Sequence, residues 1–456
     1  MAKSNTAYVC SDCGSDYSKW QGQCADCGAW NTLSEFRLAS AVSGNSRAAG
    51  RSVGYAGAPT AIASLKTIAL DEAPRIRTGL DEFDRVLGGG LVPGSAVLIG
   101  GQPGTGKSTL LLQVMSRVAA QHSTLYVTGE ESLQQVALRA RRLGIQADAL
   151  QLMAETSVEQ LLQAAASISP RIVVIDSIQV MHTGTLQAAP GSVSQVRECA
   201  AMITRFAKQT NTVVLLVGHV TKDGSLAGPK VLEHMIDCSL LLEGAADNRF
   251  RTLRGQKNRF GPANELGVFA MTEQGMREVK NPSAIFLTRA GADSPGSAVA
   301  VLWEGSRALL VEIQALVDES QAANPRRVAV GLEQNRLAML LAVLHRHGGL
   351  AVGSADVFVN AVGGVKVLET GVDLALLLAV VSSFRDRSLP GDLVVFGEVG
   401  LSGELRPVPG GQERVAEAAK HGFTRAIVPA ANKPKQAVAG MEVHAVNWLR
   451  EALELV

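Results

Sequence analysis

The stretch "GQPGTGKST", residues 101–109, decides the fold of the central part of this chain. It follows the apolar run "AVLIG" and opens a helical pattern that we expect over residues 108–120. A strand, a glycine-rich loop and a helix in this order form the context in which a G-x4-G-K-[ST] pattern is a phosphate-binding loop. The sequence therefore predicts a nucleotide site at the end of a buried strand.

The residues of this loop have separable tasks. Its glycines let successive backbone N–H groups turn toward one phosphate, Lys107 neutralises the β and γ oxygens, and Ser108 offers a hydroxyl to Mg²⁺. We therefore predict ATP and Mg²⁺ as cofactors. The predicted nucleotide-binding residues are Gly101, Gln102, Pro103, Gly104, Thr105, Gly106, Lys107, Ser108 and Thr109.

Acidic side chains follow two other apolar runs. "RIVVIDS" ends at Asp176, which can hold the water shell of the magnesium ion, although an aspartate at this position is otherwise often a helix cap. "TLYVTGEES" ends with Glu130 and Glu131, and we expect Glu130 to be the base and Glu131 to have a capping or supporting role. His219, at the end of "VVLLVGH", either reports the γ-phosphate to the following loop or is simply hydrogen-bonded.

The runs around this loop indicate a layered α/β fold. "TLYVTG", "RIVVIDS", "TVVLLVGHV" and "CSLLLEG" are apolar throughout, as expected of parallel strands covered on both faces. The Ala-, Gly- and Ser-rich text before them predicts a flexible linker, and a second α/β pattern follows. We expect four segments: residues 1–36, a small N-terminal domain that holds four of the six cysteines; 37–75, the linker; 76–276, the nucleotide-binding domain; and 285–456, a C-terminal α/β domain.

Composition limits the possible functions. The chain has 456 residues, enough for two or three domains, and 43 Lys and Arg against 42 Asp and Glu give a net charge of +1. No global field attracts it to nucleic acid or membrane, so such binding has to come from local patches. The N-terminus does not resemble a signal peptide, and the longest apolar run, residues 374–381, is far below the ~18 residues of a spanning helix. We expect a cytoplasmic protein that makes no contact with membranes.

Four of the six cysteines lie near the N-terminus, in two C-x2-C pairs separated by ten residues. Two such pairs can close four thiolates around one structural Zn²⁺, and the glycine after each pair allows the tight turn. A pair of disulfides is the alternative, but it is disfavoured in a reducing compartment. A redox C-x2-C is disfavoured because no βαβ pattern surrounds it. The predicted ligands are Cys10, Cys13, Cys24 and Cys27, whereas Cys199 and Cys238 are expected to be ordinary core residues.

Together with "TGLDEFDRVLGGGLVPGS", the order of these motifs resembles the RecA superfamily of ATPases over about residues 76–276. The resemblance implies subunits that assemble with ATP between neighbours and basic residues that reach the γ-phosphate of the next subunit. "RGQKNRFGP", residues 254–262, supplies candidates in Lys257 and Arg259, because residues 249–259 carry five cations and no acid. We expect a hairpin beyond the last sheet strands to project the pair. A neighbour's ATP and DNA phosphates are both possible anions.

The text over residues 353–456 resembles the proteolytic domain of Lon, most clearly in "GEVGLSGELRPV". The catalytic pair of that domain is missing. Gly371, or Val372 in a register shifted by one, stands where Lon has its nucleophilic serine, and Gln412 stands where it has its lysine. Neither residue can attack a carbonyl or accept a proton. We therefore expect a Lon-like fold without proteolytic activity.

The complete order of segments resembles a family of bacterial DNA-repair ATPases that combine a C4 zinc finger, a RecA-like core, the KNRFG sequence and an inactive Lon-like tail. This resemblance covers essentially the whole chain. It implies a ring, expected to be a hexamer, that hydrolyses ATP in a DNA-dependent manner, moves on single-stranded and branched DNA, and processes recombination intermediates with a RecA-type recombinase. Two rival functions are an ATP-driven switch that does not move on DNA and an ATP-dependent protease.

Overall fold

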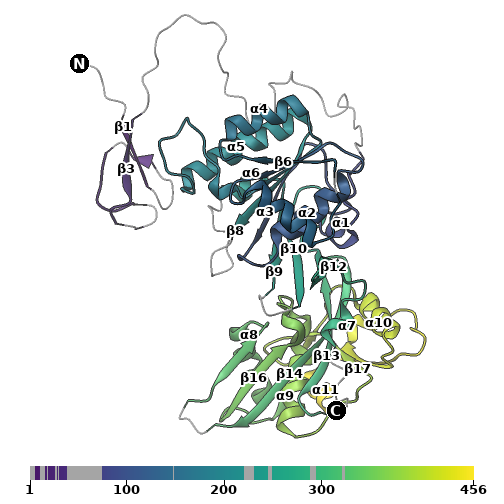
Figure 1. Ribbon diagram of the computed structural model, residues 1–456. Coiled ribbons are helices and arrows are strands. Elements are labelled where there is room, and N and C mark those ends of the chain that lie inside the picture. The colour runs from purple at the N-terminus through teal and green to yellow at the C-terminus, as the bar shows by residue number, and fades with distance from the viewer. Residues whose placement is uncertain are drawn as a thin grey trace, which may run out of the picture. The chain divides into compact units, whose positions relative to one another are not determined.

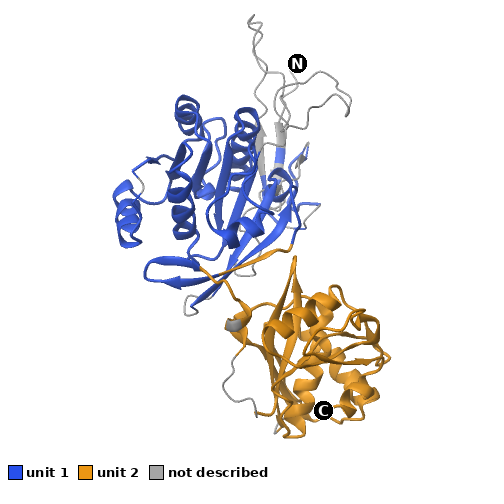
Figure 2. Ribbon diagram, turned by 90° about the vertical axis from the view of Figure 1, so that its right-hand side faces the viewer, with its two compact units in different colours: residues 1–263, 269–277 blue, residues 264–268, 278–456 orange. Residues whose placement is uncertain are grey.

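The structure, a computed structural model, describes residues 6–10, 16–17, 19–25, 28, 30–37, 74–146, 148–219, 231–244, 249–287, 294–320 and 324–456. The expected linker, 37–75, lies almost wholly outside this part of the chain. Two compact units are distinguished: residues 1–263 with 269–277, and residues 264–268 with 278–456 (Figure 2). Each is described by itself.

The first unit contains a nine-stranded sheet in the order β12-β11-β10-β9-β4-β8-β7-β5-β6. Figure 1 labels β6, β8, β9, β10 and β12 of this sheet. Six neighbouring strands are parallel. They are β4 (Ala96–Gly101), β5 (Thr124–Thr128), β6 (Leu150–Ala154), β7 (Ile172–Asp176), β8 (Val213–His219) and β9 (Cys238–Glu243). Five of them are the apolar runs that predict parallel strands, whereas β6 has no such run and was not predicted. The expected strand before the phosphate loop is β4, and it lies between β8 and β9.

Helices bury both faces of this sheet. Alternate residues of β4 enter different cores: Val97 and Ile99 pack on one side, and Ala96 and Leu98 on the other. The first core receives α1 (Asp81–Val86), α2 (Lys107–Val118) and α3 (Leu133–Arg142), and the second receives α4 (Val158–Ile168), α5 (Val193–Thr210) and α6 (Val231–Met235). The helix expected at the phosphate loop is α2. Cys199 and Cys238 are buried core residues, as predicted, and burial raises the pKa of each thiol to about 12.

Three further strands extend the sheet beyond β9. They are β10 (Phe250–Asn258), β11 (Leu266–Thr272) and β12 (Gly275–Glu278). β10 runs antiparallel to β9, and the register shifts between Gly255 and Lys257, so that Gln256 forms a bulge. A bulge bends its strand and re-aims the side chains that follow it, and this one comes directly before Lys257.

The second unit is built on a seven-stranded sheet in the order β15-β16-β14-β13-β17-β20-β21. Its helices α8 (Gln334–Gly348) and α9 (Asp373–Phe384) pack into the larger of two cores, and α10 (Gly411–Lys420) packs into the other. α11 (Leu449–Glu454) closes the larger core beside α8. The strands are β13 (Ser297–Glu304), β14 (Arg307–Glu319), β15 (Arg327–Val330), β16 (Ala355–Ala361), β17 (Leu393–Val395), β20 (Arg425–Pro429) and β21 (Glu442–Val446).

The N-terminal segment forms a small three-stranded sheet of β1 (Thr6–Cys10), β2 (Asp16–Tyr17) and β3 (Leu33–Arg37), with β1 in the centre.

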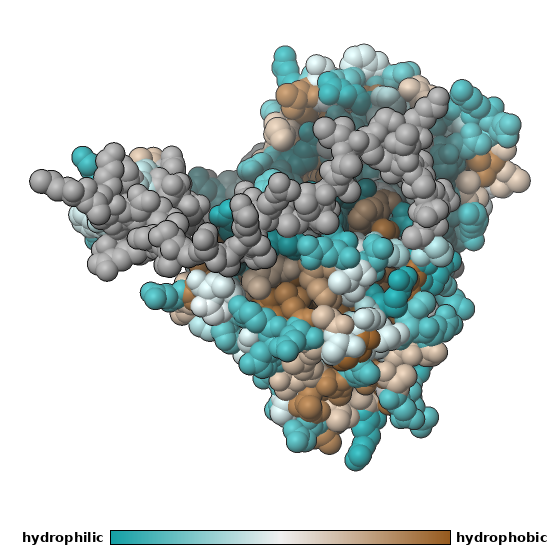
Figure 3. Space-filling model, turned by 90° about the horizontal axis from the view of Figure 1, so that it is seen from above, coloured by the Kyte–Doolittle hydropathy of each residue, from teal (hydrophilic) through white to brown (hydrophobic). Residues whose placement is uncertain are grey.

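On the face shown in Figure 3, hydrophilic residues alternate with smaller hydrophobic areas. In the part of the chain that the structure describes, no helix is both long and apolar enough to cross a membrane.

Candidate nucleotide site

The phosphate loop joins the end of β4 to the start of α2, as the sequence predicts. The backbone of Gly104 and Gly106 is left-handed, with φ of 79° and 101°, a conformation that glycine adopts without strain. Gly106 is also confined, because an added Cβ would lie 2.5 Å from Cε of Met276 and 2.7 Å from Cε of Met271. Because these two atoms are the ends of flexible methionine side chains, which can move aside, the positive φ is the main reason for glycine at both positions.

Lys107 is buried inside the loop that it serves, with 4% of its surface exposed. Its Nζ donates to the carbonyl oxygens of Gly101 (2.8 Å) and Gln102 (3.0 Å). Burial lowers the pKa of this ammonium, and the negative charges of Asp176 and Glu130 oppose that shift. Lys107, Asp176 and Glu130 are thus close enough to share one electrostatic environment, which is what a phosphate and magnesium site needs.

Asp176 ends β7, two strands from β4, and no sequence motif predicts what holds its side chain. Tyr126, on the adjacent strand β5, donates its hydroxyl hydrogen to Oδ2 of Asp176 at 2.6 Å. Tyr126 is 1% exposed, and burial together with the Asp176 charge raises the pKa of its phenol well above the ordinary value. The one sequence signal for this contact is that Tyr126 is the only aromatic residue of β5, whose other residues are threonine, leucine and valine.

Glu130 and Glu131 have different surroundings. Glu130 accepts a hydrogen bond from the hydroxyl of Ser177, and its Oε1 lies 3.4 Å from Nε2 of His219. Glu131 forms an ion pair with Arg139 on α3, and its backbone bonds to Thr128. Glu130 thus lies beside Asp176 and at the end of β8, whereas Glu131 faces a helix. This arrangement favours Glu130 over Glu131 as base, and both roles stay predictions.

β10 brings an unforeseen cation to the phosphate loop. Arg251 is 3% exposed, and its Nε donates to the backbone oxygen of Thr105 at 3.2 Å. Arg254 is also buried, with Nε 3.8 Å from a carboxylate oxygen of Glu243. Two of the five cations in residues 249–259 are therefore interior residues.

Lys257 and Arg259 lie elsewhere on the sheet. Lys257 is the penultimate residue of β10, and β11 and β12 follow it, so the expectation that the pair lies beyond the last strands was wrong. Its Nζ donates to the backbone oxygens of Glu233 and Ile236, the latter at 2.8 Å, at the C-terminal end of α6. Arg259 bonds through Nη1 to Oδ1 of Asp237 at 3.2 Å. Both cations therefore make polar contacts within their own subunit.

The register of the sheet separates Arg259 from its own phosphate loop. The backbone N of Arg259 donates to Asp237, which precedes β9 and whose own N bonds to Ala96 at the start of β4. Gly101, at the other end of β4, is five residues away, or about 16 Å at ~3.3 Å per residue. Arg259 therefore lies near the N-terminal ends of β4 and β9, whereas the phosphate loop follows the C-terminal end of β4. It does not serve the ATP site of its own chain.

The predicted metal ligands are only partly within the described residues. Cys13 and Cys27 lie outside them, whereas Cys10 and Cys24 are each 1% exposed and pack with Leu33, Tyr8 and Tyr17. Sγ of Cys10 lies 3.2 Å from Oγ1 of Thr32, and Sγ of Cys24 lies 3.2 Å from the hydroxyl of Tyr17. Buried thiols of this kind fit a structural zinc centre, and the full set of four stays a prediction.

In the C-terminal unit, the position of the missing protease serine is crowded by a buried ion pair. Arg414, which is fully buried, holds both carboxylate oxygens of Glu369 at 2.8 Å. A Cβ on Gly371 would lie 2.9 Å from Oε1 of Glu369 and 3.3 Å from Nη1 of Arg414. Gln412 is in the first turn of α10. An arginine does not lose its proton at ordinary pH, so this cation cannot take over the role of a basic lysine.

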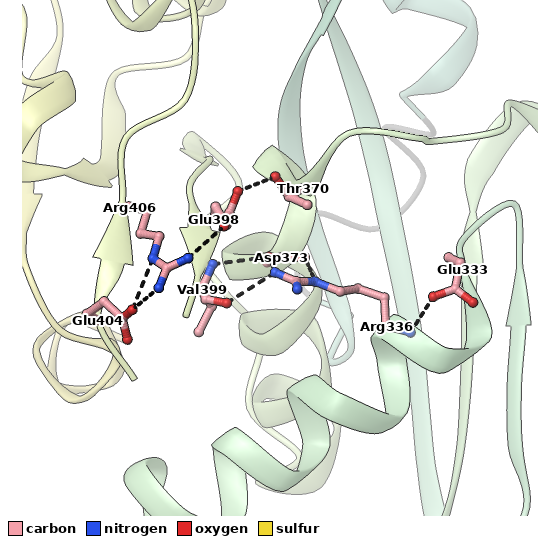
Figure 4. A network of polar contacts seen from close by, with 8 residues as sticks. All are labelled: Glu333, Arg336, Thr370, Asp373, Glu398, Val399, Glu404 and Arg406. Carbon is pink, nitrogen blue, oxygen red and sulfur yellow. Dashed lines mark hydrogen bonds and ion pairs between the residues drawn. The ribbon is translucent and has the colours of Figure 1, made fainter. Parts of the chain in front are cut away.

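A second polar network fixes the start of α9 just after Gly371 (Figure 4). Asp373 is buried, pairs with Arg336 of α8, and accepts a bond from the backbone N of Val399 at 3.1 Å. Thr370 donates to Glu398 at 2.6 Å. The turn that carries the nucleophile in Lon is thus held here by ion pairs and hydrogen bonds.

Comparisons with known proteins agree with this division of the chain. Family models match residues 8–35 (a rubredoxin metal binding domain), 66–225 (an AAA domain) and 326–432 (subunit ChlI of Mg-chelatase). The chain is 66% identical to the DNA repair protein RadA of Haemophilus influenzae, over 100% of this chain and 99% of the relative. It is also 66% identical to RadA of Escherichia coli, over 100% and 99%, and 47% identical to RadA of Bacillus subtilis, over 99% of both.

The chain belongs to the RadA family of DNA repair proteins. The predicted family and fold class are thereby confirmed: a RecA-like ATPase core, an N-terminal zinc ribbon, and a ChlI- and Lon-like C-terminal α/β domain. The RadA relatives match from end to end, which extends the agreement to the segments between the family models. The roles of single residues and the segment boundaries stay predictions.

Proposed function

We propose that this RadA-family chain is a DNA-dependent ATPase of recombinational repair. It assembles as a homo-oligomeric ring, a hexamer, on single-stranded and branched DNA, and it promotes branch migration beside a RecA-type recombinase. The family names support the repair role, and the AAA domain supports ATP hydrolysis.

One observation carries the ATPase part of the proposal. Lys107, Asp176 and Glu130 lie at or shortly after the C-terminal ends of three strands of one sheet, and the two carboxylates oppose the lowering of the Lys107 pKa by burial. Lys107, with Gly101 to Thr109, would hold the phosphates, and Asp176 and Ser108 would hold the magnesium and its waters. Bound Mg²⁺ supplies positive charge that offsets charge on the β and γ oxygens. Glu130 would orient and deprotonate the attacking water.

The ring part of the proposal depends on Lys257 and Arg259. Arg259 lies at the far edge of the sheet from its own phosphate loop, and its side chain is half exposed although it contacts Asp237. A cation at this edge can reach an ATP bound to the next subunit of a ring, as arginine fingers do. Lys257 would support Arg259 while its own ammonium is held by backbone oxygens at the C-terminal end of α6. Burial lowers the pKa of Lys257, and the nearby Arg259 charge lowers it further.

We propose Zn²⁺ on Cys10, Cys13, Cys24 and Cys27, and we propose that the Lon-like domain does not cleave peptide bonds. The zinc would stabilise the small N-terminal sheet, whose core among the described residues is too small to fold by itself. The protease function is disfavoured because Gly371 and Gln412 replace the catalytic pair and Glu369 with Arg414 fills the space beside Gly371.

The test is the ATPase rate of the full chain against added single-stranded DNA. We expect stimulation that saturates with DNA and that is absent in Lys107→Ala, the matched control that keeps the DNA-binding surfaces. A rate that does not respond to single-stranded or branched DNA would contradict the motor and favour a switch. ATP-dependent degradation of an unfolded substrate would favour the protease.

A further inference from the structure

Tyr126 contacts Asp176 of the nucleotide site, although it belongs to none of the sequence motifs that predict this site. Its ring lies in the core on one face of the sheet, and it is 1% exposed. Its hydroxyl reaches the edge of the sheet at which Asp176 ends β7. β5 and β7 are adjacent parallel strands in which Tyr126 pairs with Val174 and Thr128 pairs with Asp176. The phenol therefore approaches the carboxylate from the neighbouring strand, from a position two residues before the one that pairs with Asp176.

The core does not need this hydroxyl. A phenylalanine would fill the same apolar space, and a buried hydroxyl destabilises a fold unless it is hydrogen-bonded. The partner here is the half-buried Asp176 carboxylate, at 2.6 Å from the phenol oxygen. A neutral phenol donates and an ionised carboxylate only accepts, so this is a charge-assisted hydrogen bond, which is among the stronger kinds.

The bond fixes which carboxylate oxygen is available. Oδ2 of Asp176 is directed to Tyr126, so Oδ1 is left for the waters around a metal ion. Because Lys107 lies within electrostatic reach of Asp176, a change in the carboxylate rotamer would also change the charge that meets the phosphates. Outer partners of metal-holding groups act in this way: they orient the group, and their removal weakens metal binding.

We propose that Tyr126 is a positioning residue for magnesium: its hydroxyl holds Asp176 in the orientation that couples Mg²⁺ to nucleotide binding. The inference depends on the proposed role of Asp176. It assigns Tyr126 no contact with ATP, so the residue acts on affinity for the metal and not on the phosphate loop.

The experiment compares Tyr126→Phe with Thr124→Val in the full chain. Thr124 is on the same strand and also buried, and no partner for its hydroxyl is found among the described residues, so Thr124→Val removes a buried hydroxyl far from any carboxylate of the site. A fluorescent ATP analogue is titrated at several Mg²⁺ concentrations and in EDTA, and Mn²⁺ binding to the complex is followed by paramagnetic resonance.

In Tyr126→Phe we expect the Mg²⁺ concentration at half-maximal nucleotide affinity to rise about 10-fold, the lower end of the roughly 10–100-fold loss that removal of an outer partner causes. Nucleotide affinity in EDTA should remain as in the wild type, and saturating Mg²⁺ should restore hydrolysis. Thr124→Val should leave the Mg²⁺ dependence unchanged. An unchanged Mg²⁺ midpoint in Tyr126→Phe, or an equal loss of affinity in EDTA, would overturn the proposal.

Asp176→Asn separates this failure from failure of the site itself. If Asp176→Asn raises the Mg²⁺ midpoint and Tyr126→Phe does not, the metal site stands and the positioning role of Tyr126 is wrong. If neither substitution changes the midpoint, the assignment of Asp176 to magnesium is wrong, and the positioning role falls with it.

Discussion

Replacing Arg259 by alanine tests whether neighbouring subunits share an ATP site, and the structure predicts a small cost in stability. The guanidinium is half exposed, and its ion pair with Asp237 is one of several bonds to that carboxylate. Lys208 holds both oxygens of Asp237 at 3.1 Å, and the backbone N of Ala96 donates to Oδ2 at 3.1 Å. Asp237 therefore keeps partners in Arg259→Ala.

The expected loss of stability follows from this exposure. An ion pair between a half-exposed arginine and a carboxylate that remains paired contributes about 0–1 kcal/mol. At roughly 2–4 °C per kcal/mol for a domain of this size, the melting temperature should fall by no more than a few degrees. The loss of hydrolysis should be far larger, about 10³ to 10⁵-fold, if the guanidinium meets the γ-phosphate of the next subunit.

The assay mixes Arg259→Ala subunits with Lys107→Ala subunits, each of which is inactive alone. Some boundaries then combine an intact phosphate loop with an intact Arg259. With equal amounts and random assembly in a closed ring, about one boundary in four is of this kind. ATPase activity should therefore recover from near zero to about a quarter of the wild-type rate, with two affinity tags confirming that mixed rings form.

Lys208→Ala is the matched control, because it removes the other ion pair of Asp237 and leaves Arg259 in place. It should lose similar stability but hydrolyse ATP at close to the wild-type rate. If mixed rings form and no activity returns, the trans role of Arg259 is refuted. The pair would then bind DNA phosphates instead, and Arg259→Ala should show a shallower dependence of DNA affinity on salt concentration.

Three further outcomes are expected. Glu130→Gln should bind ATP normally but hydrolyse it about 10² to 10⁴-fold more slowly in single turnover, since an amide cannot accept the proton, whereas Glu131→Gln should stay near the wild-type rate; an equal loss in both would reverse the choice of base. Cys24→Ser should lower the zinc content, measured by mass spectrometry, from one per chain toward zero while nucleotide binding persists, and a metal-free wild type would refute the site. Gly371→Ser combined with Gln412→Lys should not cleave casein, because Glu369 and Arg414 fill the space beside position 371.

Periodicity and motif order were sufficient for the main features of the fold. Continuous apolar runs such as residues 171–177 predicted parallel strands, and the loop at 101–109 fixed the order of strand, loop and helix. These signals are local, because a strand buried on both faces needs apolar residues at every position. The order of strands in the sheet is not local. The residues of β4 do not predict that β8 and β9 are its neighbours in the sheet.

The sequence predicted the candidate site residues but not the bonds that orient them. Glycine spacing identified the phosphate loop, since backbone conformation is written in residue type at positions such as Gly106. The partners of Asp176 and Thr105 come from β5 and β10, at sequence distances of 50 and 146 residues. Residue charge alone also did not distinguish Arg251 and Arg254 as buried residues. Their burial depends on the position of their strand, β10, within the sheet.

β10 connects the cations of residues 249–259 with two different parts of the molecule. One end of this strand is tied to the phosphate loop through the bond from Arg251 to Thr105, and the other end carries Lys257 and leads to Arg259 after the bulge at Gln256. A strand paired along its length transmits displacement better than a loop does, since its ladder hydrogen bonds must shift together. If Arg259 meets the ATP of the next subunit, the same strand contacts two nucleotide sites, its own at Thr105 and its neighbour's at Arg259. Such a connection would couple hydrolysis in neighbouring subunits, and an Arg251→Ala variant should then reduce cooperativity in ATP hydrolysis while the nucleotide affinity of a single site changes less.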